Sequence, residues 1–231
     1  MKTTTLVLST LGVVLAGSCV WAQADTLELS GMDGGRYAVK VTSLKEARFK
    51  ATTRQQYDFS CGSAAVATLL THHYGYPVTE QSVFEEMFAR GDQAKIRREG
   101  FSLLDIKTYL NAHQFQADGF ELPLAKLLES GLPAIVLISD NGYHHFVVIK
   151  GMRDGRILMG DPSNGTRAVS RASFDAAWVN KLLFVIHNKQ DLAKFNQGTD
   201  WQVAPRAPLA SGLDFDNWTR GSLRKFGPGD F

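Results

Sequence analysis

The stretch CGSAAVATLLTHHY (residues 61–74) limits the folds open to this chain more than any other part of the sequence. Alanine and leucine dominate it, a composition that favours a helix, and Gly75 follows as a C-terminal cap. Its small residues suit a buried helix that packs closely against its neighbours. The rest of the chain must therefore supply the layers that cover it.

The elements around this helix change in type along the chain. Helical signals come first, and apolar β-branched runs with an Asp154-Gly155 hairpin turn come second. The predicted helices are 79–90, 102–113 with Ser102 as N-cap and Asp105 three residues on, 123–129 stopped by Gly131, and a short one from Ser173. The predicted strands are 132–139, 144–152, a strand after the Asp154-Gly155 turn, and 182–187. Helices followed by an antiparallel sheet predict an α+β fold in one domain.

The first 24 residues have the pattern of a secretory signal peptide. Lys2 precedes an apolar run over 6–20, and small residues stand at Ala22 and Ala24. The run is too short for a transmembrane helix, so we expect cleavage after Ala24, export to the periplasm and no membrane span in the mature chain. A lipoprotein anchored at Cys19 is the alternative, although Ala16 stands where such signals usually have leucine.

Two further segments flank the expected domain at 54–188. Residues 25–53 are predicted to be a strand-rich lead-in, because 36–44 alternate between polar and apolar after a GMDGG turn. Residues 189–231 are rich in Pro, Gly, Asn and Asp and lose periodicity. They predict an extended or partly disordered tail whose apolar residues could lie on the domain.

Composition and missing motifs exclude several classes of function. The formal net charge is +2, and no basic run or basic amphipathic helix occurs, which argues against nucleic acid or a membrane surface as partner. The sequence has no H-E-x-x-H motif, and a second cysteine would be lost with the signal peptide. We therefore expect neither a metal nor a cofactor.

Cys61 is the first candidate for chemistry. Cleavage after Ala24 removes Cys19, so Cys61 would be an unpaired cysteine in an oxidising compartment. Cys61 is either a small buried hydrophobic residue or a reactive thiol, and the number of cysteines leaves both possibilities open. At the first turn of a helix, the dipole would lower the pKa of an exposed thiol, and Gly62 would let a substrate backbone approach.

A nucleophilic thiol needs a base, and the chain has six histidines. His144 and His145 open a predicted strand, and alternation sends them to opposite faces, so one of them can face the cysteine. Asp161 follows His145 by sixteen residues, and the turn between them would bring the two side by side as a hydrogen-bonded pair. A turn aspartate before Pro162 is the alternative for Asp161. The remaining histidines are poorly placed because they lie about 16–18 Å up the Cys61 helix or at the ends of other elements: His72, His73, His113 and His187.

The motifs RQQYDFSCGSAAVATLLTHHYG, GFSLLDIKTYLNAHQF and HHFVVIKG followed by GDP together resemble the bacteriocin-processing peptidases, which are papain-like cysteine peptidases that cut after double-glycine leaders. The resemblance covers roughly residues 53–188. It implies a triad of Cys61, His145 and Asp161, with Gln55 rather than Gln56 in the oxyanion hole. It also implies a protein or peptide substrate.

The sequence departs from that family in two ways. Ser60 stands where many members have aspartate, and the chain has neither a phosphate-binding loop nor a transmembrane bundle. The layout is similar to the stand-alone peptidases of functional-amyloid (Fap) secretion operons, which implies substrates from such a pathway. Two other readings stay open: an inactive relative that only binds leader-like peptides, and a papain-fold acyl transferase or amidase.

Overall fold

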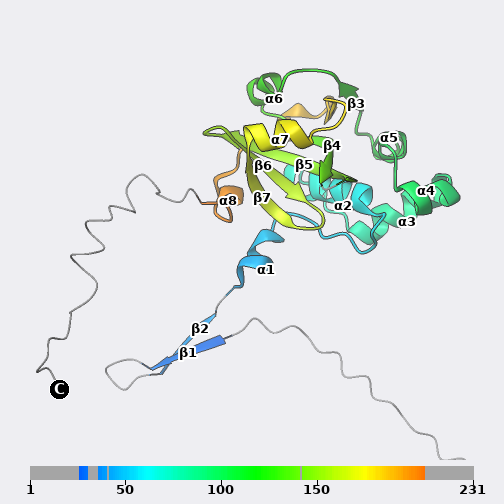
Figure 1. The fold of residues 1–231 in the computed structure, drawn as a ribbon. Helices are drawn as coiled ribbons and strands as arrows, with labels where there is room; N and C mark the ends of the chain where they lie inside the picture. The colour runs from blue at the N-terminus through cyan, green and yellow to red at the C-terminus, as the bar shows by residue number, and fades with distance from the viewer. Residues whose placement is uncertain (1–25, 31–35, 41, 141, 206–231) are drawn as a thin grey trace, which may run out of the picture. The chain divides into compact units, whose positions relative to one another are not determined.

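A computed structural model of the chain describes residues 26–30, 36–40, 42–140 and 142–205 (Figure 1). The chain divides into two compact units, Met1–Thr42 and Ser43–Phe231. This boundary falls earlier in the chain than residue 53, where the sequence placed the end of the lead-in. The expected signal peptide and its cleavage site lie outside the described residues.

The described part of the first unit is a β-hairpin. β1 (Thr26–Ser30) and β2 (Arg36–Lys40) pair in antiparallel fashion, with Thr26 opposite Lys40. The prediction of a strand over 36–44 is right for its first part. It is wrong at its end, because α1 (Leu44–Arg48) begins there with Ser43 as its N-cap.

The second unit is built on a six-stranded antiparallel sheet in the order β3-β8-β4-β5-β6-β7. The strands, in chain order, are β3 (Ala117–Phe120), β4 (Ala134–Asp140), β5 (Tyr143–Arg153), β6 (Arg156–Asp161), β7 (Gly165–Ser170) and β8 (Leu183–Ile186). The predicted turn is confirmed, since Asp154 and Gly155 both have positive φ between β5 and β6.

Helices cover both faces of the sheet (Figure 1). The predicted buried helix is found as α2 (Cys61–Thr68), every residue of which is buried, and it continues as a π-helical turn, η1 (Leu69–His73). The face that it covers also carries α3 (Glu80–Arg90), α4 (Gln93–Glu99) and α5 (Leu103–Ala112). The opposite face carries α6 (Leu124–Ser130) and α7 (Arg171–Ala177).

The ends of the helices follow the local signals in the sequence. Ser102 and Asp105 form the expected capping box, in which each side chain accepts a hydrogen bond from the other residue's backbone N–H. Thr79 caps α3 in the same position, and Gly131 ends α6 in the left-handed conformation. The prediction of α+β architecture is confirmed.

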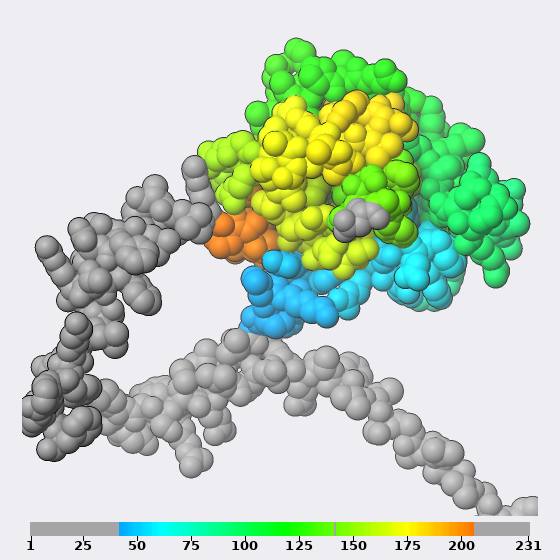
Figure 2. All heavy atoms as spheres, viewed as in Figure 1, coloured from blue at the N-terminus to red at the C-terminus, as the bar shows by residue number. Residues whose placement is uncertain are grey.

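The C-terminal segment corrects the sequence prediction. Residues 189–205 are not an extended tail, because they form η2 (Gln190–Leu192) and α8 (Gly198–Trp201). The orange atoms at the end of this segment lie beside the yellow-green atoms of the second unit in Figure 2. The Asn196 side chain bonds both backbone groups of Met152 on β5, at 2.8 and 3.1 Å. Trp201 is 3% exposed. Residues 206–231 lie outside the described residues.

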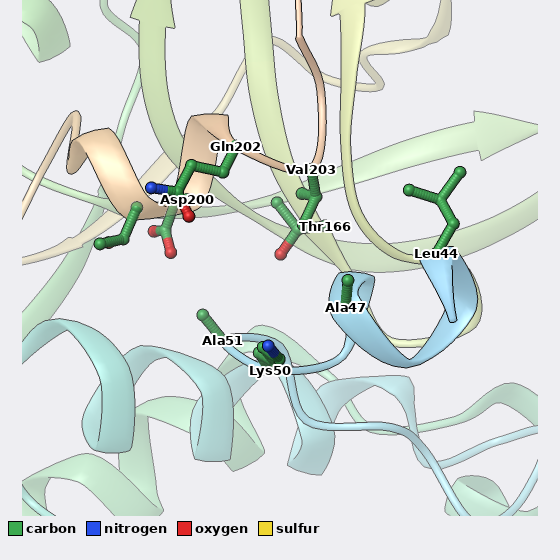
Figure 3. Close-up of a pocket in the computed structure, with 9 residues that line it drawn as sticks. Leu44, Ala47, Lys50, Ala51, Thr166, Asp200, Gln202 and Val203 are labelled. Atoms are coloured by element: carbon green, nitrogen blue, oxygen red, sulfur yellow. The ribbon is translucent and has the colours of Figure 1, made fainter. Parts of the chain in front are cut away.

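A buried ion pair fastens this segment. A bulge in β5 between Ile149 and Gly151 accompanies the burial of Lys150, which is fully buried. Its Nζ lies 3.1 Å from Asp200 Oδ2 and donates to Ala51 O at 2.7 Å and to Thr166 Oγ1 at 3.2 Å. Asp200 and Thr166 also line a cavity of about 370 Å³ (Figure 3).

Candidate active site

Cys61 is the first residue of α2 and a free thiol. The loop before it is tied down by Ser60, whose hydroxyl bonds both the N–H and the C=O of Tyr57. The side chain of Cys61 is 6% exposed, so the expectation of an exposed thiol is wrong. The role assigned to Gly62 also changes. A Cβ there would lie 2.9 Å from Phe101 Cβ, so the glycine allows α2 to pack against Phe101.

The electrostatic surroundings of the thiol oppose the simple dipole argument. Burial raises the pKa of Cys61, and the negative charge of Asp161 raises it further. Hydrogen bonds from the backbone N–H groups of Phe146, Gly62 and Cys61 itself act in the other direction but do not cancel the effect of burial. The expected lowering of the thiol pKa is therefore not found. The Phe146 contact shows that the sulfur lies at the start of β5.

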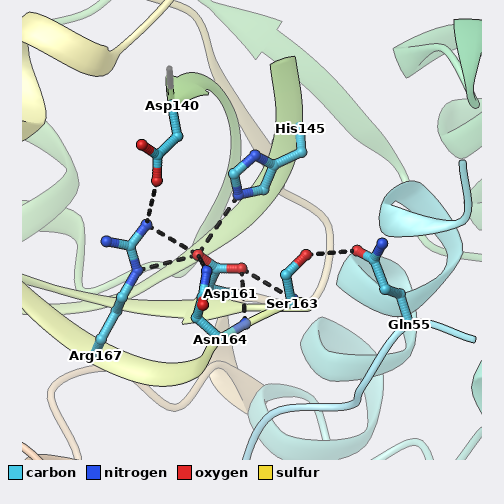
Figure 4. Close-up of polar contacts among 7 residues, drawn as sticks. All are labelled: Gln55, Asp140, His145, Asp161, Ser163, Asn164 and Arg167. Carbon is cyan, nitrogen blue, oxygen red and sulfur yellow. Dashed lines mark hydrogen bonds and ion pairs between the residues drawn. The ribbon is translucent and has the colours of Figure 1, made fainter. Parts of the chain in front are cut away.

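His145 and Asp161 meet at one end of the sheet, as the hairpin predicted (Figure 4). His145 Nε2 lies 3.5 Å from Asp161 Oδ2, and the two side chains are 3% and 0% exposed. The two ring nitrogens of His145 are buried and make no hydrogen bond within the described part of the chain. With Nε2 turned toward the carboxylate, Nδ1 is the nitrogen left open for another partner. The ring of Tyr143 stacks on that of His145.

Strand alternation does not by itself distinguish His145 from His144 as the base. Phe146 and Val148 pack with α2, whereas Val147 packs on the opposite face, so alternation puts the exposed His144 on the face of α2. The contact with Asp161 is what distinguishes His145. His145 is still paired in the sheet, opposite Ile138, close to the end of the β4–β5 ladder.

Asp161 is held by a dense set of donors. Its Oδ1 accepts the backbone N–H groups of Ser163 at 2.9 Å and Asn164 at 3.2 Å. Its Oδ2 accepts Asn164 Nδ2 at 3.1 Å and two nitrogens of Arg167. Burial favours the neutral acid, but His145, Asn164 and Arg167 outweigh it and hold the pKa of Asp161 well below its usual range. The carboxylate is therefore ionised.

Gln55 is connected to the same turn. Its backbone N–H donates to Pro162 O at 3.1 Å, and its Oε1 accepts the hydroxyl of Ser163 at 3.1 Å. Its Nε2 donates to Tyr57 O at 3.1 Å, which leaves the second hydrogen of the amide available. Gln56 is exposed. The segment 161–163 thus anchors both Asp161 and Gln55 (Figure 4).

The other histidines are occupied elsewhere. His113 pairs with Glu86, and His187 pairs with Asp118, each at 2.9 Å. Burial lowers the pKa of His73 to about 3, and its Nδ1 contacts Lys194 O at 2.6 Å. Their exclusion from the predicted site agrees with these positions.

Sequence reasoning missed Arg167, Ser163 and Asn164. They follow Asp161 in the turn and in β7, and a strand at this edge of the sheet was not predicted. Within 26–30, 36–40, 42–140 and 142–205, no group of three or more His, Cys, Asp or Glu side chains could hold a metal ion. The same residues contain no helix long and apolar enough to cross a membrane.

Comparisons with known proteins point to one family. Residues 50–190 match the Peptidase C39 family. The probable functional amyloid protease FapD of Pseudomonas aeruginosa is 38% identical over 183 residues, which are 79% of this chain and 79% of that protein. The protein of the same description from Pseudomonas fluorescens is also 38% identical, over 75% of this chain and 76% of that protein.

Transport proteins and solved structures match more distantly. The transport/processing ATP-binding protein MesD of Leuconostoc mesenteroides is 29% identical over 55% of this chain and 17% of its own length. The peptidase domain of Streptococcus ComA has a TM-score of 0.49 and 20% identity, covering 59% of this chain and 97% of that domain. A double-glycine-motif protease in complex with a leader peptide has a TM-score of 0.48 and 23% identity, covering 59% and 91%.

Proposed function

Because this chain belongs to the peptidase C39 family and is a cysteine peptidase with a papain-like fold, we propose that Cys61, His145 and Asp161 are its catalytic triad. The observation that carries this assignment is the buried contact of 3.5 Å between His145 Nε2 and Asp161 Oδ2. The hydrogen bond from the Phe146 N–H to the Cys61 sulfur supports it, because Phe146 directly follows the base.

In the first step, the thiol of Cys61 gives its proton to His145 Nδ1, and the sulfur attacks the carbonyl carbon of the scissile peptide bond. Asp161 stabilises the imidazolium that forms and fixes the ring with Nε2 toward the carboxylate. Burial of the thiol disfavours an isolated thiolate, so ionisation depends on this transfer rather than on the helix dipole. The C–N bond breaks when the imidazolium protonates the leaving amine.

The oxygen of the attacked carbonyl becomes negative and needs donors. The backbone N–H of Cys61 lies in the first turn of α2, where helical N–H groups are not taken up by carbonyl groups of the helix, and it can turn from its own sulfur to the oxyanion. The second N–H of the Gln55 amide supplies another donor. The Ser163 hydroxyl on Oε1 keeps the amide nitrogen turned away from the 161–163 turn. Water deprotonated by His145 then attacks the thioester, which releases the acid and restores the thiol.

We place this activity in the periplasm, on an exported protein or leader of a functional-amyloid secretion pathway. Support comes from the two relatives described as probable functional amyloid proteases and from the signal-peptide pattern of residues 1–24. Cleavage after Ala24 remains part of the proposal.

The test compares cells that carry the wild-type chain with cells that carry Cys61→Ala or Cys61→Ser. Mass spectrometry of envelope and secreted proteins should show one set of new protein termini in the wild type that both variants lack, because a hydroxyl is not activated in a site built for a thiol. Termini that persist in both variants would contradict the assignment of the nucleophile.

Alkylation of purified protein tests the base without knowledge of the substrate. His145→Ala should slow labelling of Cys61 by iodoacetamide at pH 7 by at least about tenfold, because the buried thiol then has no proton acceptor. His144→Ala is the matched control, since its side chain is exposed, and should label at the wild-type rate. If His144→Ala is the slow variant, the base is misassigned.

A further inference from the structure

Arg167 competes with His145 for one oxygen atom. It projects from β7, with 27% of its side chain exposed, and its Nε and Nη2 lie 3.0 and 2.9 Å from Asp161 Oδ2. The same oxygen faces His145 Nε2 at the longer distance of 3.5 Å (Figure 4). The shortest contacts of Oδ2 are therefore made by Arg167, and His145 is its weaker partner.

Crowding explains this order. A carboxylate oxygen has two lone pairs, yet Oδ2 already receives the Arg167 fork and Asn164 Nδ2 at 3.1 Å. A further strong hydrogen bond from His145 has no free lone pair to use. The distance of 3.5 Å between His145 Nε2 and Asp161 Oδ2 is longer than a strong hydrogen bond, as expected when the acceptor is already occupied.

We propose that Arg167 is a positioning residue of the peptidase, which holds Asp161 in place and, by sharing its charge, limits how strongly that carboxylate retains a proton on His145. The inference rests on the proposed triad. A base has to accept a proton from the thiol and later give it to the leaving amine, so too strong a hold on the imidazolium would hinder the second step. Arg167 sets that balance.

The charges around this point come from several elements. Asp161 lies on β6 and faces His145, and Arg167 contacts Asp161 from β7. Cys61 at the start of α2 is close enough for the charge of Asp161 to raise its pKa. Asp140 at the end of β4 reaches the outer side of Arg167, with its Oδ2 3.7 Å from Nη2. Tyr143 stacks on the imidazole. Among these groups, Arg167 is the permanent positive charge.

Removing that charge has a defined consequence. Without Arg167, Oδ2 is free to accept a full hydrogen bond from His145, and the negative charge of Asp161 acts on the imidazole undiminished. Both effects favour the imidazolium, so the titration midpoint of His145 should rise by about one pH unit or more.

The experiment is a histidine-detected NMR titration of the purified full chain in the Cys61→Ala background, where the coupled thiol is absent. The His145 midpoint should rise in Arg167→Gln and rise less in Arg167→Lys, which keeps the charge but loses the fork on Asp161 Oδ2. Arg171→Gln is the matched control, because Arg171 makes an exposed pair with Asp175 on α7, and it should change nothing.

The resonances of His113 and His187 report on the fold in the same spectra, since their ion pairs lie outside the site. An unmoved His145 midpoint in Arg167→Gln, with those two signals native, overturns the inference. If Arg167→Gln does not fold, Arg167→Lys decides, because it loses the fork on Oδ2, and an unmoved His145 midpoint in that variant overturns the inference. An error in the proposed triad would be seen separately, because His145→Ala would then label Cys61 at the wild-type rate.

Discussion

Removing the carboxylate of Asp200 should destabilise the whole second unit, although Asp200 is remote in sequence from the sheet that it fastens. Lys150 is fully buried and its Nζ has three partners, of which Asp200 is the charged one. Asp200→Ala leaves a buried ammonium with two neutral acceptors, Ala51 O and Thr166 Oγ1. The C-terminal segment would also lose its charged attachment.

Two estimates of the free energy of unfolding lost in Asp200→Ala agree. Breaking a buried ion pair by removing one partner typically costs about 3–5 kcal/mol. Lys150 can instead release its proton. At pH 7 this costs at most about 5 kcal/mol, because the ordinary pKa of lysine is near 10.4 and each pKa unit corresponds to about 1.36 kcal/mol. Burial already lowers the pKa of Lys150, so the actual cost should lie toward the lower end of the range. We expect a loss of about 3 kcal/mol.

The assay is urea denaturation, followed by tryptophan fluorescence, with Asp191→Ala as the control. Asp191 is an exposed residue of η2 in the same segment, and its removal should change the free energy of unfolding by less than about 0.5 kcal/mol. The loss in Asp200→Ala should shrink as pH rises, because deprotonation of Lys150 relieves the unpaired charge. A loss below about 1 kcal/mol at pH 7 would refute the idea that this pair holds the segment.

Two further predictions concern the oxyanion hole and the response to acid. Gln55→Ala should lower kcat about 10²–10³-fold with KM within a few-fold and Cys61 still alkylated, whereas Gln56→Ala should be nearly neutral in the same steady-state assay. Near-normal turnover in Gln55→Ala would exclude the role. His73 has a pKa lowered to about 3, so the unfolded chain binds a proton below pH 6.5 that the folded chain rejects. Stability should be unaffected by His73 above pH 6.5 and fall by up to roughly 5 kcal/mol toward pH 3, and urea titrations of His73→Gln should lack that part of the decline.

Local signals predicted the elements that are long or sharply capped. The Ser102–Asp105 box, the Asp154-Gly155 turn and the left-handed Gly131 depend on neighbouring residues alone, so the sequence contains all the information that they need. The same applies to α2, because its composition leaves no polar face. The candidate pair of His145 and Asp161 followed from one such turn and the length of two strands.

The elements that the sequence did not predict are short, and tertiary contacts determine whether they form. β3 and β7 are the two edge strands, of four and six residues, and each pairs with a single neighbour. Their sequences, ADGF and GTRAVS, contain glycine and lack the continuous apolar run that marks β8, LFVI, as a strand. The helix α4 is seven residues long and buries one side chain, Ile96.

Sequence by itself determined the helix that begins at Cys61 and the hairpin that returns Asp161 toward His145, because each depends on neighbours in the chain. The tertiary structure alone decided the environment of those groups. Burial of the thiol reversed the expected direction of its pKa shift, and β7 brought Arg167 onto the carboxylate. Solvation and charge depend on which distant segments surround an atom, and no local pattern encodes that.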